Sequence, residues 1–144
     1  MSHQKEKDIA TKRHANEITN PIIEKEIKTL AREGEIACAL AFEIAKTINV
    51  TAKDIGLNLD LSGIRINKCQ LGLFGYKPEK KIVSPLDSID QNLRDAIKEK
   101  LVDGRLPCKS AWDIALMLGI TKITVSRACE AMKIKIKPCQ LGAF

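Results

Sequence analysis

The feature that most constrains this chain is an internal repeat with a period of 70 residues. Residues 27–74 align without a gap to residues 97–144, with 15 identities in 48 pairs. The string Cys-Gln-Leu-Gly, for example, occurs at residues 69–72 and again at residues 139–142. A repeat of this length predicts two copies of one small structural unit.

Each copy is predicted to contain three short helices followed by a strand. Asn20 and Pro21 are typical of a helix start, so the first helix is expected at residues 21–32, ending before Gly34. Its counterpart is expected to begin near residue 87 and to run to 102. Apolar residues at helical spacing predict second helices at residues 37–47 and 109–118. Thr51 and Thr121 then mark the starts of third helices.

Alternating apolar and polar residues predict strands at residues 64–67 and 133–137. Aromatic residues are only 3% of the chain, so aliphatic side chains must fill the interior, which favours short helices over a sandwich or barrel. The fold class expected is therefore mainly α with short β strands. The expected organisation is a flexible tail at 1–20, a first unit at 21–76, a linker at 77–86 and a second unit at 87–144.

The second and third helices of the second copy have the residues needed for two helices that cross steeply. Ala115 is small at the expected crossing, Gly119 permits a tight turn, and Val125 can pack the third helix onto the second. At this spacing, residues 111–130 resemble the helix-turn-helix superfamily. With the following strand taken as a wing, the resemblance implies a tandem repeat of two winged helix-turn-helix-like units.

The two copies differ in charge. Residues 21–74 carry seven basic and seven acidic groups, whereas residues 91–144 carry ten basic and five acidic groups, and the net charge of the chain is +6. The third helix of the first copy is expected to show a mixed face, made of Lys53, Asp54, Gly56, Asn58 and Asp60. An anionic partner is therefore expected at the second copy.

The resemblance implies that the second unit binds double-stranded DNA as a transcription regulator. The residues expected to make the contacts come from its third helix and its strand: Lys122, Thr124, Ser126, Arg127, Lys133, Lys135 and Lys137. Arg127 would account for about 1–3 kcal/mol of sequence preference if it binds guanine with two hydrogen bonds. The strand lysines would bind phosphates, although lysines on an edge strand also serve to prevent aggregation. A homodimer would place two such units on half-sites about 34 Å apart.

The cysteines raise the question of a metal site. Four of the five form a repeated pair, Cys38 with Cys69 and Cys108 with Cys139. No two are spaced as in a zinc knuckle, and the only histidines, His3 and His14, lie in the expected tail. Buried structural thiols are the favoured interpretation, with no metal and no cofactor.

The remaining expectations concern class and location. The two units contain no glycine-rich phosphate loop and no histidine. Because these features would point to catalysis, an enzyme is not expected. The absence of a long apolar stretch or a signal peptide favours a cytoplasmic protein with no membrane contact. The alternative function is a protein interaction or assembly module that binds no nucleic acid, for example an accessory to a redox or metal enzyme.

Overall fold

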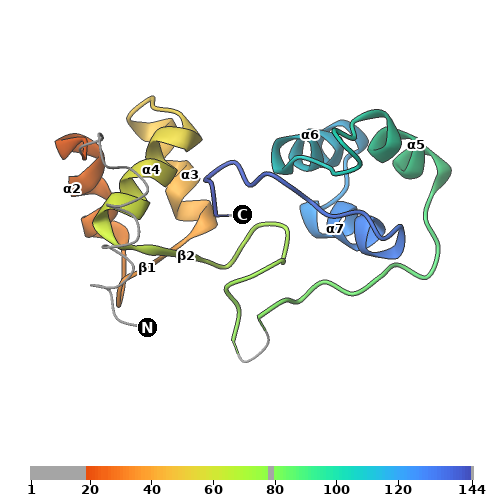
Figure 1. Ribbon diagram of the computed structural model, residues 1–144, viewed down its shortest axis with the longest axis horizontal. Helices are drawn as coiled ribbons and strands as arrows, with labels where there is room; N and C mark the ends of the chain where they lie inside the picture. The colour runs from red at the N-terminus through yellow and green to blue at the C-terminus, as the bar shows by residue number, and fades with distance from the viewer. Residues whose placement is uncertain (1–18, 78–79, 144) are drawn as a thin grey trace. The chain divides into compact units, whose positions relative to one another are not determined.

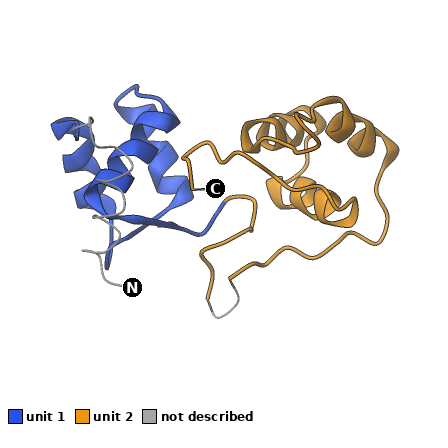
Figure 2. Ribbon diagram, viewed as in Figure 1, with its two compact units in different colours: residues 1–69 blue, residues 70–144 orange. Residues whose placement is uncertain are grey.

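The computed structural model describes residues 19–77 and 80–143 of the chain (Figure 1). These residues form a mainly helical protein with one two-stranded sheet. The chain divides into two compact units, residues 1–69 and residues 70–144 (Figure 2). Most of the expected tail, including His3 and His14, lies outside the described residues. No helix among the described residues is long and apolar enough to cross a membrane.

The first helix, α2 (Pro21–Leu30), begins where the sequence predicts. The Asn20 side chain caps it by accepting a hydrogen bond from the Ile22 amide at 2.9 Å. The helix ends two residues earlier than expected, because Arg32 and Glu35 pair as an antiparallel bridge. The two residues between them, Glu33 and Gly34, have φ of 52° and 77°, which is typical of a two-residue hairpin turn. Gly34 therefore shapes this turn rather than the helix end.

The rest of the first unit consists of β1 (Glu35–Ala37), α3 (Cys38–Thr47), α4 (Ala52–Ser62) and β2 (Arg65–Asn67). The strands β1 and β2 are parallel, with Ile36 opposite Ile66. The three helices α2, α3 and α4 contact one another. Ile27, Ala41 and Ile55 are fully buried between them and form the core.

Asn58 of α4 is buried, contrary to its expected place on an exposed face. It is 3% exposed, and its side-chain Oδ1 accepts a hydrogen bond from the backbone N–H of Asn20 at 2.7 Å. Its Nδ2 donates to the Asp54 carbonyl at 2.8 Å. The side chain is buried because both ends of its amide are satisfied there, and it connects α4 to the start of α2.

The second unit repeats this order with α5 (Gln91–Glu99), α6 (Cys108–Leu118) and α7 (Lys122–Ala131), which are grouped together in Figure 1. The helix α5 follows Asp90 and is shorter at both ends than expected. A single parallel bridge between Leu106 and Ile136 takes the place of the β1–β2 pair. Its two backbone hydrogen bonds are Leu106 N–H to the Lys135 carbonyl at 3.0 Å and Lys137 N–H to the Leu106 carbonyl at 2.9 Å.

The turn between α6 and α7 confirms the sequence prediction for Gly119, and Asn49 occupies the equivalent turn of the first unit. Gly119 has a φ of 66° and Asn49 a φ of 54°, so both adopt the left-handed conformation. The Thr51 hydroxyl accepts a hydrogen bond from the Asp54 amide at 3.0 Å, and the Thr121 hydroxyl accepts one from the Thr124 amide at 3.1 Å. Both threonines therefore cap their helices. Ala115 is 4% exposed, as expected for a residue packed between helices.

The second unit begins at residue 70, before the linker that the sequence places at residues 77–86. The reason is a set of contacts made by the residues on either side of the expected linker start. The Ile82 amide donates to the Gly72 carbonyl at 2.9 Å, and a side chain on Gly72 would meet Val83 at 2.9 Å. Because Gly72 also has a φ of 75°, only glycine suits this close approach.

Candidate nucleic-acid interface

The N-terminal turn of α7 holds the first two residues of the expected interface, Lys122 and Thr124. Both side chains are half-buried. The Lys122 ammonium lies 4.3 Å from the centre of the Trp112 ring, within range of a cation–π interaction. Trp112 is the residue of α6 that occupies the position of Phe42 in the first copy, and it is half-buried, so its ring is available to the lysine. Trp112 and Lys122 therefore connect the surfaces of α6 and α7.

Ser126 is not on the surface, which corrects its place in the expected interface. It is 1% exposed, and its hydroxyl makes no hydrogen bond with any described residue. The buried residues of α7 are Val125, Ser126, Ala128 and Cys129. These two adjacent pairs make the buried face of the helix wide, and Ser126 lies within that face. It cannot contact DNA from this position.

Arg127 is half-buried and tethered to the residues that precede α5. Its Nε donates to the Ser84 carbonyl at 3.1 Å, and its own carbonyl accepts from the Leu86 amide at 3.3 Å. Nearby, Lys81 Nζ lies 2.8 Å from each carboxylate oxygen of Glu130. Residues 81–86 therefore follow the outer side of α7, and every residue of this helix is buried or half-buried.

The lysine segment, residues 133–137, follows α7 and carries the other three expected contacts. Lys133, Lys135 and Lys137 are exposed, whereas Ile136 is 7% exposed. This alternation agrees with the period-two pattern in the sequence. The segment makes one parallel bridge, to Leu106, and no antiparallel hairpin partner follows it among the described residues.

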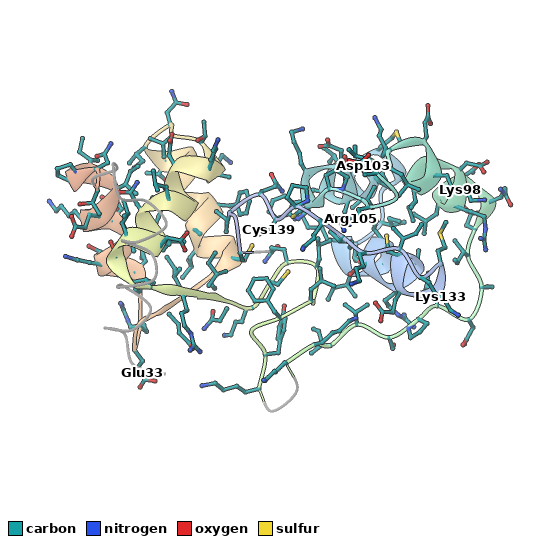
Figure 3. All side chains as sticks on the ribbon, viewed as in Figure 1. Glu33, Lys98, Asp103, Arg105, Lys133 and Cys139 are labelled. Atoms are coloured by element: carbon teal, nitrogen blue, oxygen red, sulfur yellow. The ribbon has the colours of Figure 1, made fainter. Side chains whose placement is uncertain are left out.

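A fourth cation, Arg105, belongs with the lysine segment and was missed by the sequence prediction. It precedes Leu106, whose backbone bonds to both Lys135 and Lys137. Arg105 precedes α6 and Lys133 follows α7 in the chain, and both residues are labelled in Figure 3. The repeat could have identified Arg105. Residue 105 corresponds to Glu35, which lies directly opposite Arg65 in the β1–β2 pair, and Arg65 corresponds to Lys135.

The two copies differ sharply in charge at this position. In the first unit, Glu35 forms an ion pair with Arg65 at 3.1 Å and accepts a hydrogen bond from Asn67 at 2.9 Å. In the second unit the corresponding residues are Arg105, Lys135 and Lys137, so the acid is replaced by a base. Their side chains, like that of Lys133, form no ion pair or hydrogen bond with another residue in the described ranges. Like charges held together without a counter-charge attract anions.

Lys133 also has an unusual backbone conformation. Its φ is 58°, in the left-handed region that favours glycine, and the first copy has Gly63 with a φ of 68° at the corresponding position. A residue with a side chain is strained there by about 1 kcal/mol. A lysine that replaces glycine at such a cost is consistent with a role for its charge.

The cysteines are mostly enclosed. Cys38, Cys69, Cys108 and Cys129 are buried, and Cys139 is half-buried. Within residues 19–77 and 80–143, no three histidine, cysteine, aspartate or glutamate side chains are grouped so that they could hold a metal ion. The Gln140 amide lies 3.6 Å from the Cys108 sulfur, as a donor to it.

Burial makes Cys129 unreactive. It raises the pKa of this thiol from 9.0 to about 12, and the negative charge of Glu130 adds to the effect. At pH 8 we expect a disulfide reagent to label Cys139 at least tenfold faster than Cys129, as followed by mass spectrometry of tryptic peptides. Equal labelling rates in the folded protein would contradict this assignment.

The same pKa shift has a consequence for stability. The unfolded thiol ionises near pH 9 and the folded thiol near pH 12, so the contribution of Cys129 is complete below pH 9 and is lost as the pH rises towards 12. A Cys129→Ala variant should therefore lose less of its unfolding free energy than the parent over this interval, as measured by urea unfolding at pH values on either side of 9.

Comparison of the chain with protein-family models, with curated proteins and with solved structures gives no match.

Proposed function

We propose that this chain is a DNA-binding protein that regulates transcription and that its second unit contacts duplex DNA. The observation that carries the proposal is the set of four cations without partners among the described residues, Arg105, Lys133, Lys135 and Lys137. Positive side chains on an exposed extended segment beside a helix suit the phosphates of a duplex. Each unit is proposed to be a helix-turn-helix-like copy, in which α6 and α7 form the pair of helices of the second unit.

The proposed interface differs from the one expected from the sequence. Phosphate contacts are assigned to the lysine segment and to Arg105, and Lys122 and Thr124 approach the duplex from the first turn of α7. Ser126 is left out because it is buried. Arg127 can reach a base only with the guanidinium nitrogens that do not bind Ser84. The proposal requires no cofactor and no catalytic residue.

The first unit is proposed to have a structural role. Its basic Arg65 is neutralised by Glu35, so the position that is cationic in the second unit is paired in the first. A duplicated protein in which the cations at this position are without partners only in the second copy is consistent with a division of roles between support and binding.

The test is the affinity of the full chain for a fluorescent duplex as salt increases. Fluorescence anisotropy should show a binding constant whose logarithm falls linearly with the logarithm of salt concentration, by roughly 0.9 for each phosphate contacted. Four phosphate contacts would give a slope of about 3 to 4. Absence of binding at low salt, or binding that does not respond to salt, would refute the proposal.

A second candidate function, protein–protein contact, is favoured by two adjacent apolar residues of α6. Leu116 is 85% exposed and Met117 is 64% exposed. Exposed apolar side chains of this size are typical of contact surfaces, including the surface of a homodimer.

We expect the double variant Leu116→Glu, Met117→Glu to dissociate such a dimer. Sedimentation equilibrium would show at least a tenfold larger dissociation constant than for the parent, since charged residues are not tolerated in an apolar contact. The matched control is Lys109→Glu, Asp113→Lys on the same helix, which keeps the exposed apolar pair. A parent that is monomeric at high concentration would leave no role for the pair in a homodimer.

A further inference from the structure

The second unit contains a cavity of about 670 Å³ beside the C-terminal half of α7. Cavities of this size hold small organic molecules. The residues that line it come from α7, from the lysine segment and from residues 73–74, together with Lys81, Arg105 and Ala143. All of them belong to the second unit.

Four of the residues that line the cavity have large apolar side chains. They are Leu73, Phe74, Ile134 and Ile136. An ion surrounded by its own water would gain nothing from these side chains, whereas an organic body would be removed from water by them. The wall therefore favours a ligand with an apolar portion.

Other lining residues are cationic. Arg105, Lys133, Lys135 and Lys137 all line the cavity, and no described residue pairs with their side chains. The lining residues include one acid, Glu130, and Lys81 already neutralises it with two contacts of 2.8 Å. The net charge that a ligand meets is positive, so the ligand should be an anion.

Ser126 provides a third, independent sign of a ligand. Ser126 is among the residues that line the cavity, is 1% exposed, and has a buried hydroxyl with no hydrogen-bond partner among the described residues. A buried hydroxyl without a partner is uncommon in folded proteins, because it has lost water and gained nothing in return. The corresponding residue of the first unit is Gly56, which has no such group.

We propose that this cavity binds a small organic anion, in which a carboxylate, sulfonate or phosphate ester is attached to an apolar body. The anionic group lies at Arg105 and the lysine segment, with Ser126 as a hydrogen-bond donor or acceptor. The apolar body rests on Leu73, Phe74 and Ile134. Because the same cations are assigned to DNA phosphates, the ligand would also release DNA; only this regulatory step rests on the proposed function.

The probe for the test is 8-anilinonaphthalene-1-sulfonate, which carries a sulfonate on an aromatic body and fluoresces when removed from water. The full chain should bind one equivalent. The variant Arg105→Glu should bind at least tenfold more weakly, because it replaces a charge-assisted contact with repulsion. Its fold should persist, since a glutamate at this position, opposite Lys135, reproduces the ion pair of Glu35 with Arg65. Lys98→Glu, an exposed change of the same charge on α5, is the matched control and should bind within twofold of the parent.

Two further measurements keep the test independent of the folding of one variant. Ser126→Ala should weaken probe binding by about three- to tenfold while circular dichroism stays unchanged. Phenyl phosphate should displace the probe at a concentration at least tenfold lower than inorganic phosphate does, since only the former has an apolar body. Binding that is equally strong in Arg105→Glu and in the parent, or equal displacement by both phosphates, would overturn the proposal.

The two proposals can fail separately. If the chain binds the probe in an Arg105-dependent manner but binds no duplex, the cavity assignment stands and the DNA-binding proposal fails. If it binds duplex but not the probe, the reverse holds. If it binds both, phenyl phosphate should release a labelled duplex from the parent at concentrations that fill the cavity, and failure to release it would refute the regulatory step.

Discussion

Replacing Lys133, Lys135 and Lys137 together by alanine is expected to weaken duplex binding by about 10- to 100-fold at moderate salt. The three side chains are exposed and have no partner among the described residues, so they are free to bind phosphates. Removing each phosphate-binding lysine should also lower the slope of the salt dependence by about one. The decrease in affinity should be the same for all duplex sequences, because phosphates carry no base information.

The matched control removes the same charge from another surface of the second unit. Lys98, Lys100 and Lys109 are exposed and do not line the cavity. Their triple alanine variant should bind duplex within about threefold of the parent, with a nearly unchanged salt slope. If this control loses as much affinity as the lysine-segment variant, binding depends only on net charge and the assigned surface is wrong.

The core variant Ile114→Ala is expected to abolish most duplex binding by unfolding the second unit. Ile114 of α6 is fully buried, and removing a buried isoleucine side chain to the β-carbon costs about 2–5 kcal/mol. That cost is a large part of the stability of a unit of this size. Hydrogen exchange should accelerate throughout α5, α6 and α7, and duplex affinity should fall by at least tenfold.

The repeat supplies the control for this variant. Ile44 of α3 corresponds to Ile114 and is 2% exposed, so Ile44→Ala creates a similar cavity in the first unit. It should accelerate exchange in α2, α3 and α4 and leave duplex affinity within about threefold of the parent. If Ile44→Ala weakens binding as strongly as Ile114→Ala, the first unit takes part in binding and the division of roles between the two copies is wrong.

The lysine segment shows which features of a segment can be predicted from its sequence pattern. Alternating lysine and isoleucine predicts an extended segment with its lysines exposed, and the structure agrees for Lys135, Ile136 and Lys137. The pattern does not identify the partner of the segment, because any neighbouring backbone can supply the hydrogen bonds. The structure pairs it in parallel with Leu106, thirty residues earlier, and this pairing brings Arg105 to the lysines.

The third helix of the second unit shows the opposite case. Its start at Thr121 follows from a local hydrogen bond and was predictable. The burial of Ser126 and the tether of Arg127 were not, because both depend on residues that lie far from the helix along the chain, such as Ser84 and Leu86. The burial of Asn58 was not predictable for the same reason, because its side-chain oxygen accepts a hydrogen bond from the distant Asn20 backbone.

The amino-acid sequence by itself therefore determined the duplication, the helix starts at Asn20, Thr51 and Thr121, and the left-handed turns at Asn49 and Gly119. Each depends on neighbouring residues or on a comparison of the chain with itself. Only the tertiary structure decided which residues of α7 are covered, and only it grouped Arg105 with the lysines around a cavity. The reason is that burial and charge clustering arise from contacts between distant segments, and a linear pattern contains no record of which segments will meet.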